Sequence, residues 1–315
     1  MTATCPACLA PNARFALKTL LYRGCARDIY DCPDCGASFH HPLPSLEDIA
    51  RCYPPFYFQG FFRQYWKDYY KGRALAKRLL PWRRSGSFLD VGCALGTLLA
   101  GMRDHSGWKV SGLEFSETAA AMGRELNHVE IACAGLAQAP WPDACYDCIH
   151  INNVLEHESE PEAAVRAAAR LLNPGGRLLL TIPNGPVDIL ANRLLYAKHG
   201  PLATRHGGHL FFFSRRSLKL LLERCGLEVL SIRCFHFKLG AKARGWLPGS
   251  WRKFLAQAPK SWAQAEEGCT LEQGRKLIGP QPSWMLYWLL QQSRRLWRLP
   301  YTDFGYDLEV IAQRF

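Results

Sequence analysis

The sequence has 315 residues, of which 48% are hydrophobic, so the chain can bury a core large enough for one domain plus an accessory piece. Its 39 lysines and arginines against 27 acids give a formal charge of +12, which favours acidic partners such as nucleic acid, nucleotide-linked substrates or an anionic membrane surface without selecting one. The composition excludes an intrinsically disordered chain, and no apolar run is long enough to span a bilayer.

Two Cys-x-x-Cys pairs stand near the start of the chain. Each pair places two thiolates on one tight turn, and two such turns facing each other give the tetrahedral sulfur site that Zn²⁺ prefers. We therefore predict a structural zinc ribbon, with a proline-stiffened connector, over residues 1–60. Its predicted ligands are Cys5, Cys8, Cys32 and Cys35.

Other interpretations of these cysteines exist. Two disulfides or four unrelated thiols are alternatives, but 13 cysteines in a chain without a secretory leader indicate a reducing, cytoplasmic compartment. Cys25 and His40 are spare donors that could replace a ligand of the pairs. Gly36 directly follows the second pair and supplies the relaxed backbone that such turns use.

Aromatic residues recur at helical spacing over residues 61–84, with lysines and arginines between them. We interpret this stretch as a helix that covers the ligand pocket of the next domain and turns a solvated basic face outward. The alternative is a surface for phosphate or nucleic acid.

The stretch from Phe88 to Leu99 predicts an apolar strand, a glycine turn and the start of a helix. Small residues let the turn approach a ligand closely, and the helix behind it points free N–H groups at that ligand. Asp90 at the strand end would repel a pyrophosphate, so a cationic cofactor fits better. Glu114 ends a second strand, where an acid can accept hydrogen bonds from ribose hydroxyls.

The spacing Asp-x-Gly-x-x-x-Gly of this turn resembles the first motif of class I S-adenosylmethionine (SAM)-dependent methyltransferases, with Ala94 in place of the usual middle glycine. The Asn-x-Val-Leu-Glu-His segment at 152–157 and Leu-x-Pro-Gly-Gly at 172–176 resemble further landmarks of small-molecule members. The resemblance implies a Rossmann-like α/β core with seven strands, and SAM as cofactor. The implied SAM-binding residues are Asp90, Gly92, Cys93, Gly96, Glu114, Phe115, Leu136 and Asn152.

A histidine is the predicted general base if the acceptor is a hydroxyl. His157 follows the fourth strand, where such cores present the donor methyl, and His206 and His209 on a histidine-rich stretch are alternates. The segment also resembles the Glu-x-x-Glu-His metal motif of quinone-type O-methyltransferases. Asn153 stands at its first position, so the sequence predicts no catalytic metal.

The predicted domains are the ribbon and connector (1–60), the methyltransferase core with its covering helix (61–237), a helical insertion (238–303) and the last core strand (304–315). The insertion is rich in tryptophan and arginine, and Trp284–Leu299 is a candidate helix in it. A lid packed on the core is the first interpretation of the insertion, and a contact with a membrane surface or lipid-linked acceptor is the second.

The predicted activity is O-methylation of a sugar, glycan or natural-product hydroxyl by in-line transfer from SAM. Three alternatives stay open from the sequence: a ribosomal-RNA methyltransferase whose ribbon grips RNA, a nucleotide-sugar C-methyltransferase, and a non-catalytic SAM-binding module.

Overall fold

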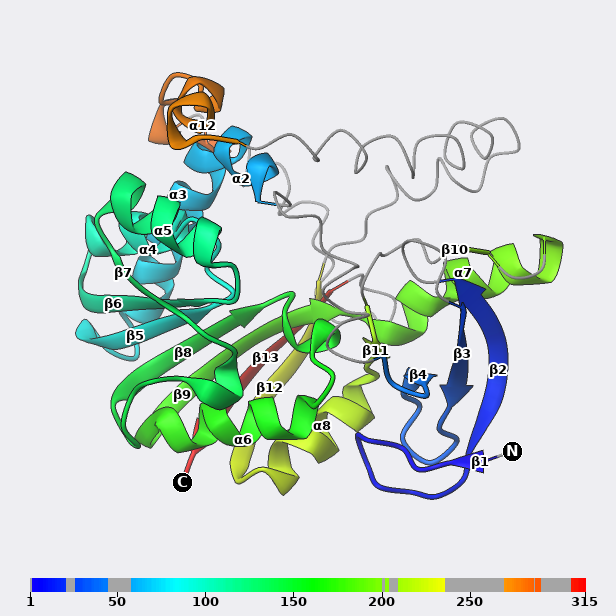
Figure 1. Ribbon diagram of the computed structural model, residues 1–315. Coiled ribbons are helices and arrows are strands. Elements are labelled where there is room, and N and C mark those ends of the chain that lie inside the picture. Colours follow the sequence, from blue (N-terminus) through cyan, green and yellow to red (C-terminus); the bar gives the residue numbers. More distant parts are fainter. Residues whose placement is uncertain are drawn as a thin grey trace.

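The computed structural model describes residues 2–20, 26–44, 58–199, 202–203, 209–235, 269–285, 287–289 and 307–315. Its main feature is a sheet of seven strands in the order β12-β13-β9-β8-β5-β6-β7 (Figure 1). The strands are β5 (Ser85–Val91), β6 (Gly107–Glu114), β7 (Glu130–Cys133), β8 (Tyr146–Asn152), β9 (Leu172–Pro183), β12 (Leu227–Phe235) and β13 (Asp307–Arg314).

The strand count agrees with the seven-stranded core that the resemblance implies, and the strand directions make the sheet a mixed one. β5 pairs in parallel with β6 on one side and with β8 on the other, while β13 runs antiparallel to both of its neighbours, β9 and β12. The chain order therefore reverses between β5 and β8. In open α/β sheets, ligands bind outside the carboxyl ends of the strands at such a reversal.

Helices cover both faces of this sheet. Alternate residues of β5 face opposite layers: Phe88 packs in a cluster with α4, whereas Leu89 packs with α6 and α8. Because both faces of β5 are covered by helices, its buried residues form a continuous apolar run in the sequence. The helices concerned are α3 (Tyr65–Leu79), α4 (Thr97–Arg103) and α5 (Glu117–Asn127), with α6 (Pro161–Leu171) and α8 (Arg215–Arg224) on the other face.

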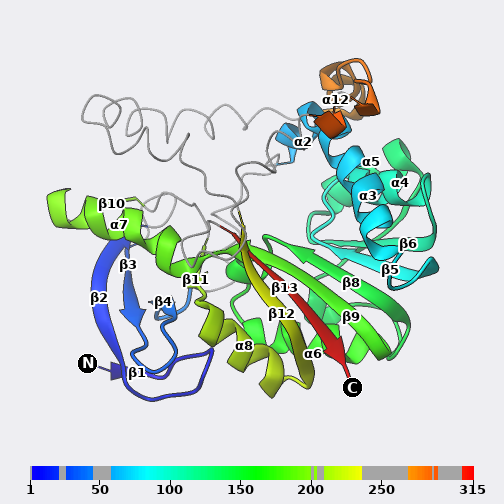
Figure 2. The ribbon, with the colours of Figure 1, turned by 180° about the vertical axis from the view of Figure 1, so that it is seen from behind.

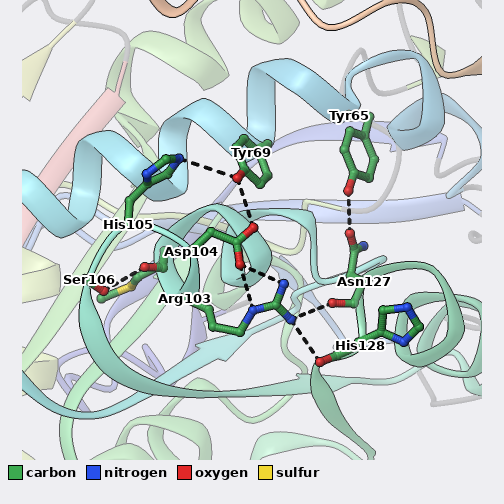
Figure 3. Close-up of polar contacts among 9 residues, drawn as sticks. Tyr65, Tyr69, Arg103, Asp104, His105, Ser106, Asn127 and His128 are labelled. Carbon is green, nitrogen blue, oxygen red and sulfur yellow. Dashed lines mark hydrogen bonds and ion pairs between the residues drawn. The ribbon is translucent and has the colours of Figure 1, made fainter.

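The basic aromatic stretch forms α2 (Gln59–Arg63) and α3, and α3 lies along α4. Figure 3 shows how polar side chains join α3 to its neighbours: the Tyr69 hydroxyl donates to Asp104 Oδ2 (2.9 Å) just after α4, and the Tyr65 hydroxyl donates to Asn127 Oδ1 (2.7 Å) at the end of α5. Asn127 in turn donates to the carbonyl of Leu95 in the glycine turn (2.6 Å). The helix thus buttresses the turn, and the side chains of Lys67, Lys77 and Arg78 are exposed.

A second sheet of six strands is built mainly from the N-terminal residues (Figure 2). Its strands are β1 (Thr2–Ala3), β2 (Ala13–Leu20), β3 (Ala26–Asp31), β4 (Ser38–His41), β10 (Leu202–Ala203) and β11 (Phe211–Phe212). Both β10 and β11 come from the histidine-rich stretch far along the chain. The pairing of β11 with β4 places Phe211 opposite Phe39, and their rings stack at 6.4 Å.

Some predicted features lie outside the described residues, namely His206, Cys25 and most of 238–303. Within that last range the structure describes α12 (Leu271–Leu277), which packs on α2, and a following segment that carries Trp284. The Trp284 ring packs against Tyr70 of α3 (5.3 Å) beneath the Arg73 guanidinium (4.2 Å). None of the helices in the described part of the chain combines the length and apolar character needed to cross a bilayer.

Candidate functional site

The glycine turn follows β5 directly, as the sequence predicts. Gly92 (φ 69°), Ala94 (φ 49°) and Gly96 (φ 65°) all have left-handed backbone conformations, so Ala94 takes the conformation usually left to glycine. A Cβ on Gly92 would lie 2.4 Å from Cγ2 of Val154, which belongs to the segment after β8. The turn and that segment are therefore in direct contact, and this contact tolerates no side chain at position 92.

Asp90 is buried beside the turn and is held by a histidine that the sequence analysis missed. His150 Nδ1 lies 2.7 Å from Asp90 Oδ1, because residues 90 and 150 are register partners on the parallel strands β5 and β8. The Phe88 ring stacks on the imidazole at 6.1 Å. Only the strand pairing reveals this partner, since His150 looks like an ordinary strand residue in the sequence.

Glu114 ends β6, as predicted, and its carboxylate bridges two backbone groups. The N–H of Ala94 donates to Oε2 and the N–H of Ser116 donates to Oε1, both at 2.9 Å. Each oxygen of a carboxylate can accept two hydrogen bonds, so a glutamate at a strand end can hold backbone donors and hydroxyl donors together. Burial, with help from the charges of Asp90 and Glu114, raises the pKa of the Cys93 thiol, which therefore stays neutral in the turn.

The other predicted cofactor residues lie around the same edge of the sheet. Phe115 follows Glu114 and is 77% exposed, which is unusual for a phenylalanine and leaves a ring face open to a ligand. Asn152 is exposed at the carboxyl end of β8. Leu136 is buried in the short helix η2 (Leu136–Gln138), so it contributes packing rather than a polar contact.

Two of the predicted catalytic histidines come together. The rings of His157, in the short helix η3 (Leu155–His157), and His209 lie 4.8 Å apart in an edge-to-face arrangement. Asp188, fully buried in the first turn of α7 (Gly185–His199), places Oδ2 2.9 Å from His209 Nδ1. A carboxylate at Nδ1 fixes the orientation of the imidazole and leaves Nε2 as the ring atom directed elsewhere.

Glu156 lies next to this histidine pair. Its carboxylate is 1% exposed, and burial raises its pKa to about 7. The backbone fixes its position: the N–H of Leu210 donates to the Glu156 carbonyl (2.7 Å), and the N–H of His40 donates to the Leu210 carbonyl (3.0 Å). Sequence reasoning missed Asp188, because a lone acid in a helix gives no sign of its long-range partner. It noted Glu156 only as part of the segment at 152–157 and assigned it no role.

The four predicted metal-ligating cysteines form one cluster, with all four sulfurs within 4.8 Å of one another. Two of the sulfur pairs, Cys5–Cys35 and Cys8–Cys32, are 3.6 and 3.5 Å apart. These distances are too long for disulfides and close to the spacing of about 3.8 Å that tetrahedral Zn–S bonds of about 2.3 Å require. The donor set and its geometry thus fit a structural zinc ion.

The two cysteine turns have matching hydrogen bonds. The N–H of Leu9 donates to the Cys5 carbonyl (2.8 Å), and the N–H of Gly36 donates to the Cys32 carbonyl (2.9 Å). Leu9 (φ 65°) and Gly36 (φ 72°) also share the left-handed backbone conformation. Two similar turns facing each other are what the paired spacing predicts.

The cluster is tied to the core by side chains of α8 and its cap. The guanidinium of Arg224 donates to the carbonyls of Ala7 (2.6 Å) and Pro6 (3.2 Å) in the first turn. It also pairs with Glu162 of α6. Ser214, the N-cap of α8, donates to the Cys35 carbonyl (2.6 Å) in the second turn. The two cysteine turns therefore pack together with α6 and α8 as one unit.

A family model described as "Methyltransferase domain" matches residues 62–232. Among curated proteins, the ubiquinone/menaquinone biosynthesis C-methyltransferase of Escherichia fergusonii is 34% identical over 114 residues, which are 33% of this chain and 45% of that protein. The ubiquinone biosynthesis O-methyltransferase of Idiomarina loihiensis is 30% identical over 155 residues, which are 46% of this chain and 62% of that protein. The chain therefore covers less than two thirds of the length of either relative.

Two solved structures are similar at low sequence identity. The geranyl diphosphate C-methyltransferase from Streptomyces coelicolor A3(2) has a TM-score of 0.43 at 15% identity, covering 77% of each chain. The YcgJ protein from Bacillus subtilis has a TM-score of 0.46 at 14% identity, covering 77% of this chain and 97% of that one.

Proposed function

Because the chain belongs to the methyltransferase domain family and is a SAM-dependent methyltransferase, we propose that it transfers the methyl group to a hydroxyl of a small-molecule acceptor. The observation that carries this proposal is the His157–His209 pair, whose rings lie 4.8 Å apart with His209 oriented by Asp188. An oriented imidazole is the usual general base for a hydroxyl nucleophile near neutral pH.

SAM is proposed to lie across the carboxyl ends of β5, β6 and β8. Gly92 and Gly96 give the backbone its close approach, Glu114 accepts from the ribose hydroxyls, and the exposed Phe115 ring covers the adenine. Cys93, Leu136 and Asn152 complete the wall of this site, and Asp90 holds its shape through His150.

The transfer is a single displacement. The acceptor O–H bond breaks and its proton passes to an imidazole, while the oxygen electron pair forms the new C–O bond. The bond between the methyl carbon and the sulfonium sulfur breaks, and its electron pair stays on sulfur to give S-adenosylhomocysteine. The sulfonium supplies the reactive methyl, and the protein supplies alignment and the base.

The acceptor class is proposed to be a natural-product, phenolic or sugar hydroxyl. Two similar curated proteins are methyltransferases of ubiquinone biosynthesis, one of them an O-methyltransferase, which supports a phenolic acceptor. The Glu156–His157 segment after β8, in the place where the small-molecule members carry it, supports the small-molecule class.

The test compares His209→Asn with the wild-type chain. S-adenosylhomocysteine formation is measured on a panel of phenolic and sugar acceptors, and SAM binding is measured by calorimetry. We expect turnover to fall about 10²–10⁴-fold with SAM affinity unchanged. His105→Asn, two residues beyond the end of α4 that is remote from the glycine turn, is the matched control and is expected to keep full turnover. Full turnover of both His209→Asn and His157→Ala would contradict the histidine role.

A structural Zn²⁺ held by Cys5, Cys8, Cys32 and Cys35 is proposed as part of the same molecule. Four protein ligands leave no open coordination position, so this ion stabilises the fold and takes no part in methyl transfer.

A further inference from the structure

We propose that Met285, Trp288 and Leu289 form a docking surface for an anionic lipid bilayer, together with the neighbouring cations Arg73 and Lys77 of α3. The three apolar side chains are 67%, 47% and 51% exposed. Single exposed apolar residues are common on proteins, but a cluster of large ones indicates a surface that binds something. None of these five residues belongs to the proposed SAM or acceptor site, so lipid binding is independent of the proposed function.

The apolar side chains share one face of a short helical segment. Residues 284, 285 and 287–289 are helical, and the N–H of Tyr287 donates to the Ser283 carbonyl (3.0 Å). Positions 285, 288 and 289 are spaced by three and four residues, so their side chains project from the same side of the helix. A surface helix ordinarily buries its apolar face in the core, whereas this segment exposes one to solvent.

Aromatic contacts hold the other side of this segment on α3. The rings of Trp284 and Tyr287 lie 5.3 and 5.0 Å from the ring of Tyr70, which is buried. The Tyr70 hydroxyl also donates to the Pro282 carbonyl. The segment therefore cannot turn its exposed apolar face onto the core without breaking these contacts.

Two cations of α3 border the segment. The Arg73 guanidinium carbon lies 4.2 Å from the centre of the Trp284 ring, and Lys77 Nζ lies 5.2 Å from it. Among the residues that the structure describes, neither cation forms an ion pair, whereas the next cation of the helix, Arg78, pairs with Glu309. Uncompensated positive charges beside an apolar surface attract an anionic lipid surface.

The surface continues along α3 toward its end. Arg73, Lys77 and Leu80 are spaced by four and three residues, so they share one stripe of the helix, and Leu80 is 49% exposed. In both ribbon views the orange part of the chain, residues 269–285 and 287–289, stands at the outer edge of the molecule beside α2 (Figure 1, Figure 2). A partner as large as a bilayer can reach a surface at such an edge.

A lipid surface fits this combination of side chains better than other partners do. Helices that bind bilayers carry tryptophan and leucine on the apolar face with lysine or arginine beside it. A second copy of the chain would bring two sets of Arg73 and Lys77 together, and like charges repel each other. Nucleic acid would pair with these cations, but it would leave Met285 and Leu289 without an apolar partner.

The experiment measures co-sedimentation of the full-length chain with lipid vesicles, without SAM or acceptor. Vesicles of three parts phosphatidylcholine to one part phosphatidylglycerol are compared with vesicles of phosphatidylcholine alone. We expect the anionic vesicles to bind about tenfold more tightly or better. Binding should weaken as salt rises, because the Debye length falls from about 10 Å at 0.1 M to about 3 Å at 1 M.

Lys77→Gln is expected to weaken binding to the anionic vesicles about fivefold, which corresponds to about 1 kcal/mol for one lysine at such a surface. The double variant Met285→Ser/Leu289→Ser is expected to weaken it about tenfold or more. The matched control, Lys219→Gln/Leu220→Ser, changes the same kinds of residue in α8 on the other face of the sheet, where the side chains are 56% and 38% exposed. This control should bind as the wild type does.

SAM affinity is measured on each variant and should be unchanged, which shows that the fold is intact. Absence of wild-type binding to the anionic vesicles, or equal weakening in the α8 control, would overturn the lipid surface. A wild-type dimer that the Met285→Ser/Leu289→Ser variant converts to a monomer, with no vesicle binding, would instead identify a second copy of the chain as the occupant. Failure to find a hydroxyl acceptor would overturn the proposed function and leave the vesicle result unaffected.

Discussion

Gly92 lies in the turn that is proposed to hold SAM, and it contacts the segment after β8 that carries His157. Its φ is 69°, and a Cβ there would lie 2.4 Å from Val154 Cγ2. Two separate effects therefore oppose a side chain at this position: backbone strain and a collision with the opposite wall of the site.

Gly92→Ala is expected to weaken SAM binding about tenfold or more, because the added methyl group must push Val154 and the turn apart. A loss of about 1.4 kcal/mol in binding free energy already lowers the affinity tenfold. Gly175→Ala is the matched control: Gly175 has nearly the same φ (74°), but a Cβ there meets nothing within 4 Å. Both variants should lose about 1–2 kcal/mol of stability from backbone strain, and only Gly92→Ala should lose SAM affinity. Equal SAM affinity of the two variants, measured by calorimetry, would refute the collision argument.

At the scale of elements, the contact between α3 and α4 positions the glycine turn. A Cβ on Gly101 of α4 would lie 1.9 Å from the carbonyl oxygen of Tyr69, and a Cβ on Gly72 of α3 would lie 1.9 Å from that of Leu98. The two helices therefore touch backbone to backbone. Because α4 begins at the turn, a shift between these helices displaces the turn as well.

Gly101→Ala is expected to destabilise the chain by about 1–3 kcal/mol through overpacking and to weaken SAM binding at the same time. Gly60→Ala in α2 is the control, because a Cβ at Gly60 meets nothing within 4 Å. That substitution should instead stabilise the chain by about 0.5–1 kcal/mol, as alanine favours helix over glycine. Urea unfolding measures the stability change of each variant. A Gly101→Ala variant with wild-type stability and full SAM affinity would show that the spacing of α3 and α4 affects neither stability nor the turn.

At the scale of the whole molecule, the cysteine cluster and the methyltransferase core share one hydrophobic core. Cys5, Cys35 and Phe39 pack in the same cluster as Leu218 and Leu221 of α8. Arg224 and Ser214 add polar contacts across this boundary. Loss of the proposed zinc should therefore destabilise the methyltransferase core as well as the first 44 residues.

Cys8→Ser is expected to lose the proposed zinc, measured by mass spectrometry, and to lower the midpoint of thermal unfolding of the entire chain in one transition. Cys145→Ser changes a cysteine outside the cluster and should retain the ion. A separate early transition of the N-terminal sheet, with the core unfolding unchanged, would show that the two parts fold independently.

The elements of the core could be predicted from the sequence, because their signals are local. Apolar runs ending in Asp90 and Glu114, and glycines at fixed spacing between a strand and a helix, specify the local backbone whatever surrounds them. The paired cysteine spacing likewise predicts two matching turns, and Cys5, Cys8, Cys32 and Cys35 do gather in one cluster.

The partners of these local features depended on the tertiary structure. His150 meets Asp90 only because β5 and β8 pair in one register, and Asp188 meets His209 only because α7 and the segment before β11 fold back together. Such contacts depend on the packing of the entire chain, since residues distant in sequence carry no local sign of each other. The sequence by itself determined that the core belongs to the SAM-binding class and that the chain forms two cysteine turns. Only the tertiary structure brought Glu156, His157 and His209 together, because the strand pairing of β11 with β4 carries His209 to the end of β8.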